Sequence, residues 1–171
     1  MLFIKPQFPF NPSNLSNLYK KEILFPNSFT VIGFVVNIYD AVNYDIDLQI
    51  SQEDRKKIIK ANYEKYQYNE YHNYELVHKL KDSCIYRCRI YGIGVNRQKK
   101  PDIKRLPVLN KIKRKIDNLD GWIVCEIVGI DNYNRILANI YIPEKNENDW
   151  EMIDIKDMLL EKEYFYQLKS N

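Results

Sequence analysis

The sequence predicts a mainly β protein of the α+β class: a five-stranded barrel with one helix after the third strand and another near the C-terminus. Two observations predict this fold. First, β-branched and aromatic residues alternate with polar residues in five separate stretches. Second, a basic segment with an apolar stripe at helical spacing lies between the third and fourth of these stretches.

Length and composition favour one soluble globular domain. The chain has 171 residues, of which 45% are hydrophobic and 29% charged, which excludes a wholly disordered chain, a collagen-like fibre and a disulfide-dense scaffold. The longest apolar run, Val31 to Val36, is too short to cross a bilayer. Lysine and proline soon follow the apolar start, so we expect no secretory signal. Together with an odd count of three cysteines, these features predict an intracellular, non-secreted protein.

Residues 1–28 are expected to form an extended docking arm ahead of the barrel domain, which we place at 29–171. Four of the seven prolines fall in this stretch, where they remove backbone donors and disfavour a helix or a central strand. Its apolar residues follow no clean period. We expect Phe3, Phe8 and Phe10 to contact a protein partner.

The first two strands are predicted at 29–39 and 44–50, with a turn from Asp40 to Asn43. A tyrosine-rich insertion follows at 51–82, where Ser51 and Asp54 resemble a helix-capping pair. We expect its tyrosines to pack or to contact a partner, with base stacking as the alternative. The predicted interface residues are Tyr63, Tyr66, Tyr68, Tyr71 and Tyr74.

The third strand is predicted at 84–95, the fourth at 122–129 and the fifth at 135–142, with a closing helix at 154–162. The apolar stripe of the basic helix between strands three and four consists of Leu106, Leu109, Ile112, Ile116 and Leu119. This order of strands and helices is that of an OB-like barrel.

Charge is distributed unevenly along the chain. From Arg97 to Lys115 there are nine Lys or Arg residues and one acid, whereas Glu144 to Glu163 holds eight acids and three lysines. The basic segment predicts contact with nucleic acid, and two solvated helices of opposite sign are the alternative. The predicted contact residues are Arg97, Lys99, Lys100, Lys111, Lys113, Arg114 and Lys115.

Two motifs resemble a known family. The later one reads Val124-Cys-Glu-Ile-Val-Gly-Ile-Asp-Asn-Tyr-Asn-Arg-Ile-Leu-Ala-Asn-Ile-Tyr141, and the earlier one reads Arg89-Ile-Tyr-Gly-Ile-Gly-Val-Asn-Arg97. With them, the region from about Val31 to Lys162 resembles the staphylococcal-nuclease-like (thermonuclease) domain, in particular that of large DNA viruses. The resemblance implies an SNase-type barrel.

The resemblance also implies where a site would lie. Members of the family hydrolyse phosphodiesters with a calcium ion held by two aspartates, a glutamate that activates water, and two arginines on the phosphate. Arg89 and Arg135 match both arginines, and Asp40 matches the first aspartate. The second aspartate falls on Gly94 and the glutamate on Arg97, and a guanidinium cannot act as the base.

The resemblance therefore implies a degenerate nuclease that is not an enzyme and holds no metal or cofactor. Arg89, Arg135 and Asp40 would then be the remnant of a phosphate site. Two alternatives stay open: Asp45 or Asp47 could replace Asp40 as a metal ligand, and the arginines could simply pair with nearby aspartates.

The remaining candidate residues favour structural roles. His72 and His78 lie in the insertion without a nearby nucleophile and acid, so we expect surface or interface histidines. Cys84 and Cys88 should face one side of a strand and Cys125 a neighbouring strand, as buried thiols rather than zinc ligands.

Three functions remain. The first is a non-catalytic structural or interaction subunit of a larger assembly, with protein partners bound through the arm and the insertion. The 14 tyrosines, with many Asn, Ile and Lys residues, are typical of AT-rich genomes. We therefore expect a virus particle, as a minor capsid or virion component, or the viral factory in host cytoplasm. The second function is a nucleic-acid-binding module that has lost cleavage, and the third is a divergent calcium-dependent nuclease.

Overall fold

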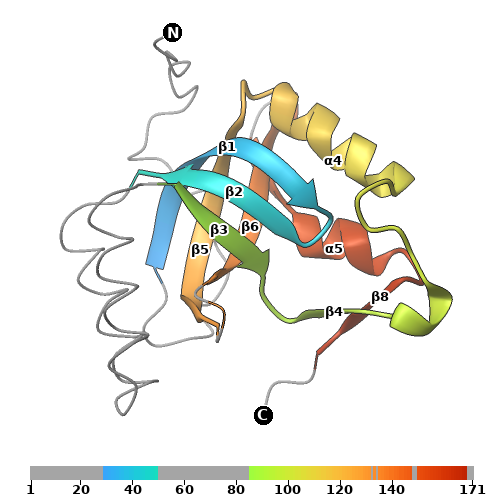
Figure 1. The fold of residues 1–171 in the computed structure, drawn as a ribbon. Helices are drawn as coiled ribbons and strands as arrows, with labels where there is room; N and C mark the ends of the chain where they lie inside the picture. The colour runs from blue at the N-terminus through green and yellow to red at the C-terminus, as the bar shows by residue number, and fades with distance from the viewer. Residues whose placement is uncertain (1–28, 50–84, 132, 134, 148–149, 169–171) are drawn as a thin grey trace, which may run out of the picture.

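The computed structural model describes residues 29–49, 85–131, 133, 135–147 and 150–168 (Figure 1). The docking arm predicted at 1–28 and the insertion predicted at 51–82 lie outside the described residues, and so do Cys84 and both histidines.

Five strands close into a barrel. They are β1 (Phe29–Asp40), β2 (Asn43–Leu48), β3 (Ile85–Ile90), β5 (Trp122–Ile130) and β6 (Ile136–Lys145). Neighbours pair antiparallel in the order β3-β2-β1-β5-β6, and β3 then pairs with β6 in parallel, which closes the barrel. This strand order is that of an OB-like barrel, so the predicted fold class is confirmed.

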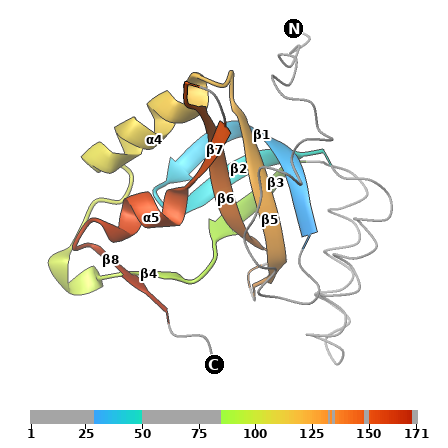
Figure 2. The same cartoon turned by 180° about the vertical axis from the view of Figure 1, so that it is seen from behind.

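The strand predicted at 84–95 is divided in the structure. β3 ends at Ile90, and Tyr91 and Gly92 turn the chain, with Gly92 at a φ of +76° that favours glycine. The next strand, β4 (Ile93–Val95), leaves the barrel and pairs antiparallel with β8 (Phe165–Gln167). A further strand, β7 (Trp150–Asp154), pairs with β6 (Figure 2). Neither β7 nor β8 is predicted from the sequence.

Both predicted helices are present, and they lie next to each other on one side of the barrel (Figures 1 and 2). Helix α4 (Pro107–Asp117) begins with proline at its first turn, and α5 (Ile155–Leu160) begins at Asp154, whose carboxylate accepts from the Lys156 N–H at 2.9 Å. A 3-10 helix, η2 (Arg97–Lys99), precedes α4. The described helices are all too short or too polar to cross a membrane.

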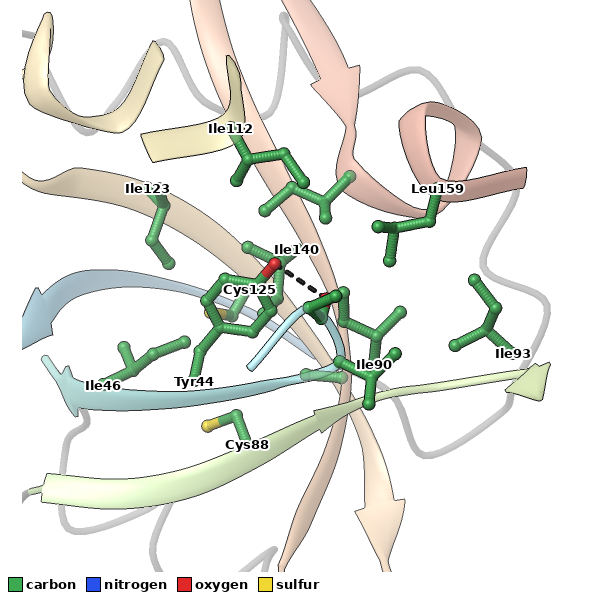
Figure 3. Packing of buried hydrophobic residues seen from close by; sticks show 14 of the residues in the cluster. Tyr44, Ile46, Cys88, Ile90, Ile93, Ile112, Ile123, Cys125, Ile140 and Leu159 are labelled. Carbon is green, nitrogen blue, oxygen red and sulfur yellow. Dashed lines mark hydrogen bonds between the residues drawn. The ribbon is translucent and has the colours of Figure 1, made fainter. Parts of the chain in front are cut away.

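The core fills the barrel and extends beneath the two helices (Figure 3). Cys88 of β3 and Cys125 of β5 are buried there, as predicted, and burial raises the pKa of both thiols. Their strands are not paired with each other, contrary to the expectation of neighbouring strands, because β6 lies between them. Both thiols belong to the core cluster in the barrel interior, where Cys88 also contributes to the raised pKa of Cys125.

A buried polar chain attaches α5 to the outside of the barrel. The Asn139 side chain of β6 donates to Glu126 of β5 at 2.7 Å, and Nζ of Lys156 in α5 donates to the Asn139 side-chain oxygen at 2.8 Å. Glu126 and Asn139 are almost completely buried, so their polar side-chain atoms have lost contact with water. These hydrogen bonds satisfy those atoms and offset the cost of desolvating them.

Candidate functional site

Asp40 ends β1 and organises the β1–β2 turn. Its Oδ1 accepts hydrogen bonds from the backbone N–H groups of Val42 (2.9 Å) and Asn43 (2.8 Å), and the Asn43 side-chain amide lies 3.1 Å from both carboxylate oxygens. Aspartate is favoured in tight turns for such bonds to the following backbone. The turn falls where the sequence predicted it, and both oxygens of Asp40 are occupied by it.

Arg135 connects this turn to the loop between β5 and β6. Asp131 accepts from the backbone N–H groups of Tyr133 and Arg135, both at 2.9 Å, which fixes the loop. The guanidinium of Arg135 then pairs with Asp131 at 2.6 Å and donates to the Asn43 side-chain oxygen at 3.1 Å. Two turns that are distant in the sequence are thereby held together.

Arg89 lies next to Arg135 but is stabilised differently. Its guanidinium donates to the backbone carbonyl oxygens of Ile93 (2.9 Å) and Ile90 (3.3 Å), and within the described residues it forms no ion pair. Burial lowers the pKa of Arg89, and the positive charge of Arg135 lowers it further. The alternative role for these arginines, an ion pair with a nearby aspartate, therefore holds for Arg135 but, among the described residues, not for Arg89.

A second arginine stands on the same face of β3. Arg87 forms a bidentate pair with Asp45 at 2.8 and 3.1 Å, which raises the pKa of Arg87. Its guanidinium also lies 4.1 Å from the centre of the Tyr39 ring. Asp45 is thus committed to Arg87 and has not replaced Asp40 at the turn.

Arg87, Asp45 and Arg135 border an open groove of about 750 Å³, which we call the arginine groove. Its lining residues are Asp45, Ile85, Arg87, Arg97, Tyr133 and Arg135. Tyr133 is 80% exposed, and the guanidinium of Arg135 lies 5.3 Å from the centre of its ring.

Arg97 brings a further positive charge to the groove from η2. The Asn96 side chain caps this short helix by accepting from the Gln98 N–H at 3.2 Å. The Arg97 side chain is exposed, forms no ion pair among the described residues, and is close enough to lower the pKa of Arg89. The position at which the resemblance has a catalytic glutamate therefore carries a cation facing the arginines.

The residues present do not fit a calcium ion. The oxygens of Asp40 are engaged in the turn, and the second aspartate position is Gly94. A Cβ added at Gly94 would clash with the ring of Tyr166, so the tyrosine ring covers this position. In the part of the chain that the structure describes, no three Asp, Glu, His or Cys side chains converge as metal ligands would.

The basic residues predicted to contact nucleic acid do not share one surface. Arg97 lines the arginine groove, whereas Lys113 lines a separate groove beside α4. Lys99 pairs with Glu163 at 2.7 Å, and Lys115 pairs with Glu144 at 2.6 Å. The remaining three, Lys100, Lys111 and Arg114, are exposed at the end of η2 and on α4.

Arg87 and Tyr133 line the groove but were not predicted from the sequence. A signal existed for Arg87, because residues two apart on a strand share a face and Arg87 is two residues before Arg89. Tyr133 lies within the quoted motif, between Asp131 and Arg135. The predicted interface residues at 1–28 and 51–82 lie outside the described residues.

No protein-family model and no curated protein matches the chain. Among solved structures, the extended Tudor domain TD3 from mouse TDRD1 in complex with a MILI peptide containing dimethylarginine 45 aligns with a TM-score of 0.41 and 10% identity, over 82% of this chain and 94% of that chain. The human TDRD1 extended Tudor domain in complex with a symmetrically dimethylated peptide aligns with a TM-score of 0.45 and 10% identity, over 89% and 96%. The fold described above follows from the strand pairings themselves.

Proposed function

We propose that the chain is a non-catalytic module that binds the phosphate backbone of a nucleic-acid strand in the arginine groove. The observation that carries this proposal is an excess of positive charge. Three guanidinium groups from β3, η2 and the β5–β6 loop line the groove, and the two ion pairs described above neutralise only two of them. Arg97 remains uncompensated in the groove, and the charge of Arg89, close enough to interact with Arg97 and Arg135, adds to the positive potential beside it, which favours an anionic ligand.

The chemistry of the groove favours a nucleic-acid strand among anions. Planar guanidinium groups match phosphate oxygens, and several of them side by side match a repeating phosphate backbone. The exposed ring of Tyr133 offers a surface for base stacking. The face formed by the second and third strands, together with the loop between the last two barrel strands, is where OB barrels bind oligonucleotides.

Binding without cleavage is the expected outcome. Asp40 serves the turn, Gly94 has no side chain, and Arg97 cannot accept the proton of an attacking water. Single- and double-stranded DNA and RNA incubated with the protein and calcium should therefore stay intact on denaturing gels. Metal-dependent cleavage that disappears in the Asp40→Ala variant would contradict the proposal.

Charge reversal tests where the strand binds. We expect Arg97→Glu to weaken binding of a fluorescein-labelled single-stranded oligonucleotide severalfold in fluorescence anisotropy, because it removes one phosphate contact and adds repulsion. Lys111→Glu makes the same change in charge on α4, outside the arginine groove, and should have little effect. An equal loss in both variants would mean that net charge and not the groove determines binding.

The role as a subunit of a larger assembly stays a prediction from the sequence. It rests on the proline-rich arm at 1–28 and the tyrosine-rich insertion at 51–82.

A further inference from the structure

The second half of β1 has an open edge. β1 pairs with β5 over Phe29–Phe34 and with β2 from Gly33 to Asp40. On the β5 side, the Val35 N–H donates to the Gly121 carbonyl at 2.9 Å, and the Ala41 N–H donates to the Ile103 carbonyl at 2.8 Å. Between these two bonds, residues 36–40 have no strand partner on that side within the described part of the chain.

A groove of about 360 Å³ follows this open edge and separates it from α4. Four consecutive β1 residues line it, from Val35 to Ile38. Side chains alternate between the two faces of a strand, so four consecutive lining residues indicate that the backbone edge itself faces the groove. The opposite wall is one face of α4, with Leu109, Lys113 and Ile116 at helical spacing.

The lining combines apolar surface with positive charge. Val36 is 50% exposed, and Leu109 and Ile116 contribute the apolar part of the helix wall. Lys104 and Lys113 are the lining cations, against a single acid, Asp117. An acidic ligand is therefore favoured, provided that it also offers small apolar side chains.

We propose that this groove binds an extended acidic peptide segment of a partner protein, which adds to the open edge of β1 as a short strand. An unpaired strand edge presents a row of N–H and C=O groups that another extended chain can satisfy. A nucleic-acid backbone has acceptors but no matching row of amide donors, so it fits this edge poorly. The site is separate from the arginine groove and does not depend on the function proposed for it.

A short acetylated and amidated peptide of alternating glutamate and valine is a suitable probe. Added to the full chain labelled with ¹⁵N, it should shift the amide signals of residues 36–39 on β1 and 109–113 on α4. The same peptide N-methylated at every amide should not bind, because it lacks the donors for strand pairing. A lysine–valine peptide should bind at least about tenfold more weakly because of the lysines in the groove.

Two charge reversals on α4 locate the contact. Lys113→Glu, within the groove, should weaken binding of the glutamate–valine peptide about tenfold. Lys111→Glu, on the same helix but outside the lining, should change it less than about threefold. The proposal is overturned if the acidic peptide does not bind, if the N-methylated peptide binds equally well, if a single-stranded oligonucleotide competes for the same residues, or if both variants lose affinity equally.

Discussion

Tyr44 is completely buried inside the barrel, and its hydroxyl donates to the Ala41 carbonyl oxygen at 2.9 Å (Figure 3). Burial raises the pKa of Tyr44 strongly, and the nearby charge of Asp40 raises it further. The thiols of Cys88 and Cys125, buried in the same interior, are affected in the same direction. The folded protein therefore keeps these three protons at alkaline pH, where an unfolded chain loses them.

Stability should consequently fall at alkaline pH. Above about pH 9 the unfolded state binds fewer protons than the folded state, so the free energy of unfolding decreases as pH rises. Urea unfolding at neutral pH and at about pH 10.5 measures this decrease. Tyr44→Phe should lower stability by about 1 kcal/mol at neutral pH through the lost hydrogen bond and should also show a smaller alkaline decrease. Parallel pH profiles for both proteins would contradict this account.

Two glycines in barrel strands show how closely the elements pack. A Cβ at Gly33 of β1 would lie 2.5 Å from Cγ2 of Ile46 and 3.1 Å from Cδ1 of Ile123, and both isoleucines are fully buried. At Gly129 of β5 an added Cβ would meet no atom within 4 Å. The close packing of Ile46 and Ile123 against β1 therefore requires glycine at position 33, whereas position 129 leaves space.

The pair of alanine substitutions at these glycines tests the packing. Gly33→Ala should destabilise the fold by about 1–3 kcal/mol, because neither isoleucine can move away within the filled core. Gly129→Ala is the matched control and should change stability by less than about 0.5 kcal/mol. The urea midpoint of each variant measures the effect, and equal midpoints would show that the strands have more freedom here than the structure indicates.

At the scale of elements, the sequence predicted what local periodicity determines. The five barrel strands and both helices were found because alternation and helical spacing are local. The end of β3 was missed, because the turn at Tyr91 and Gly92 interrupts an otherwise continuous β pattern. β7 has five residues and pairs with the preceding strand β6, whereas the three-residue β8 forms only through pairing with the distant β4. Of the arginine groove, the sequence predicted Arg97 and Arg135 but not Arg87 and Tyr133. These residues come together only when β3 pairs with β6 and closes the barrel.

At the scale of the whole molecule, the described residues contain a complete barrel with its own core. Partner recruitment through residues 1–28 is a prediction from the sequence alone. We expect a variant lacking these residues to keep its circular dichroism spectrum but to lose its partner proteins in affinity purification from the source cells. If the shortened protein stays folded and recovers the same partners as the full chain, the arm is not the docking segment.

The salt dependence of strand binding tests the central claim most directly. The affinity for a single-stranded oligonucleotide, measured between about 50 and 200 mM salt, gives a slope that counts the phosphate contacts. We predict a measurable slope for the full chain, a decrease of roughly 0.7 in its magnitude for Arg97→Ala, and no change for Lys111→Ala. An unchanged slope in Arg97→Ala, or binding that is insensitive to salt, would contradict a phosphate-binding arginine groove.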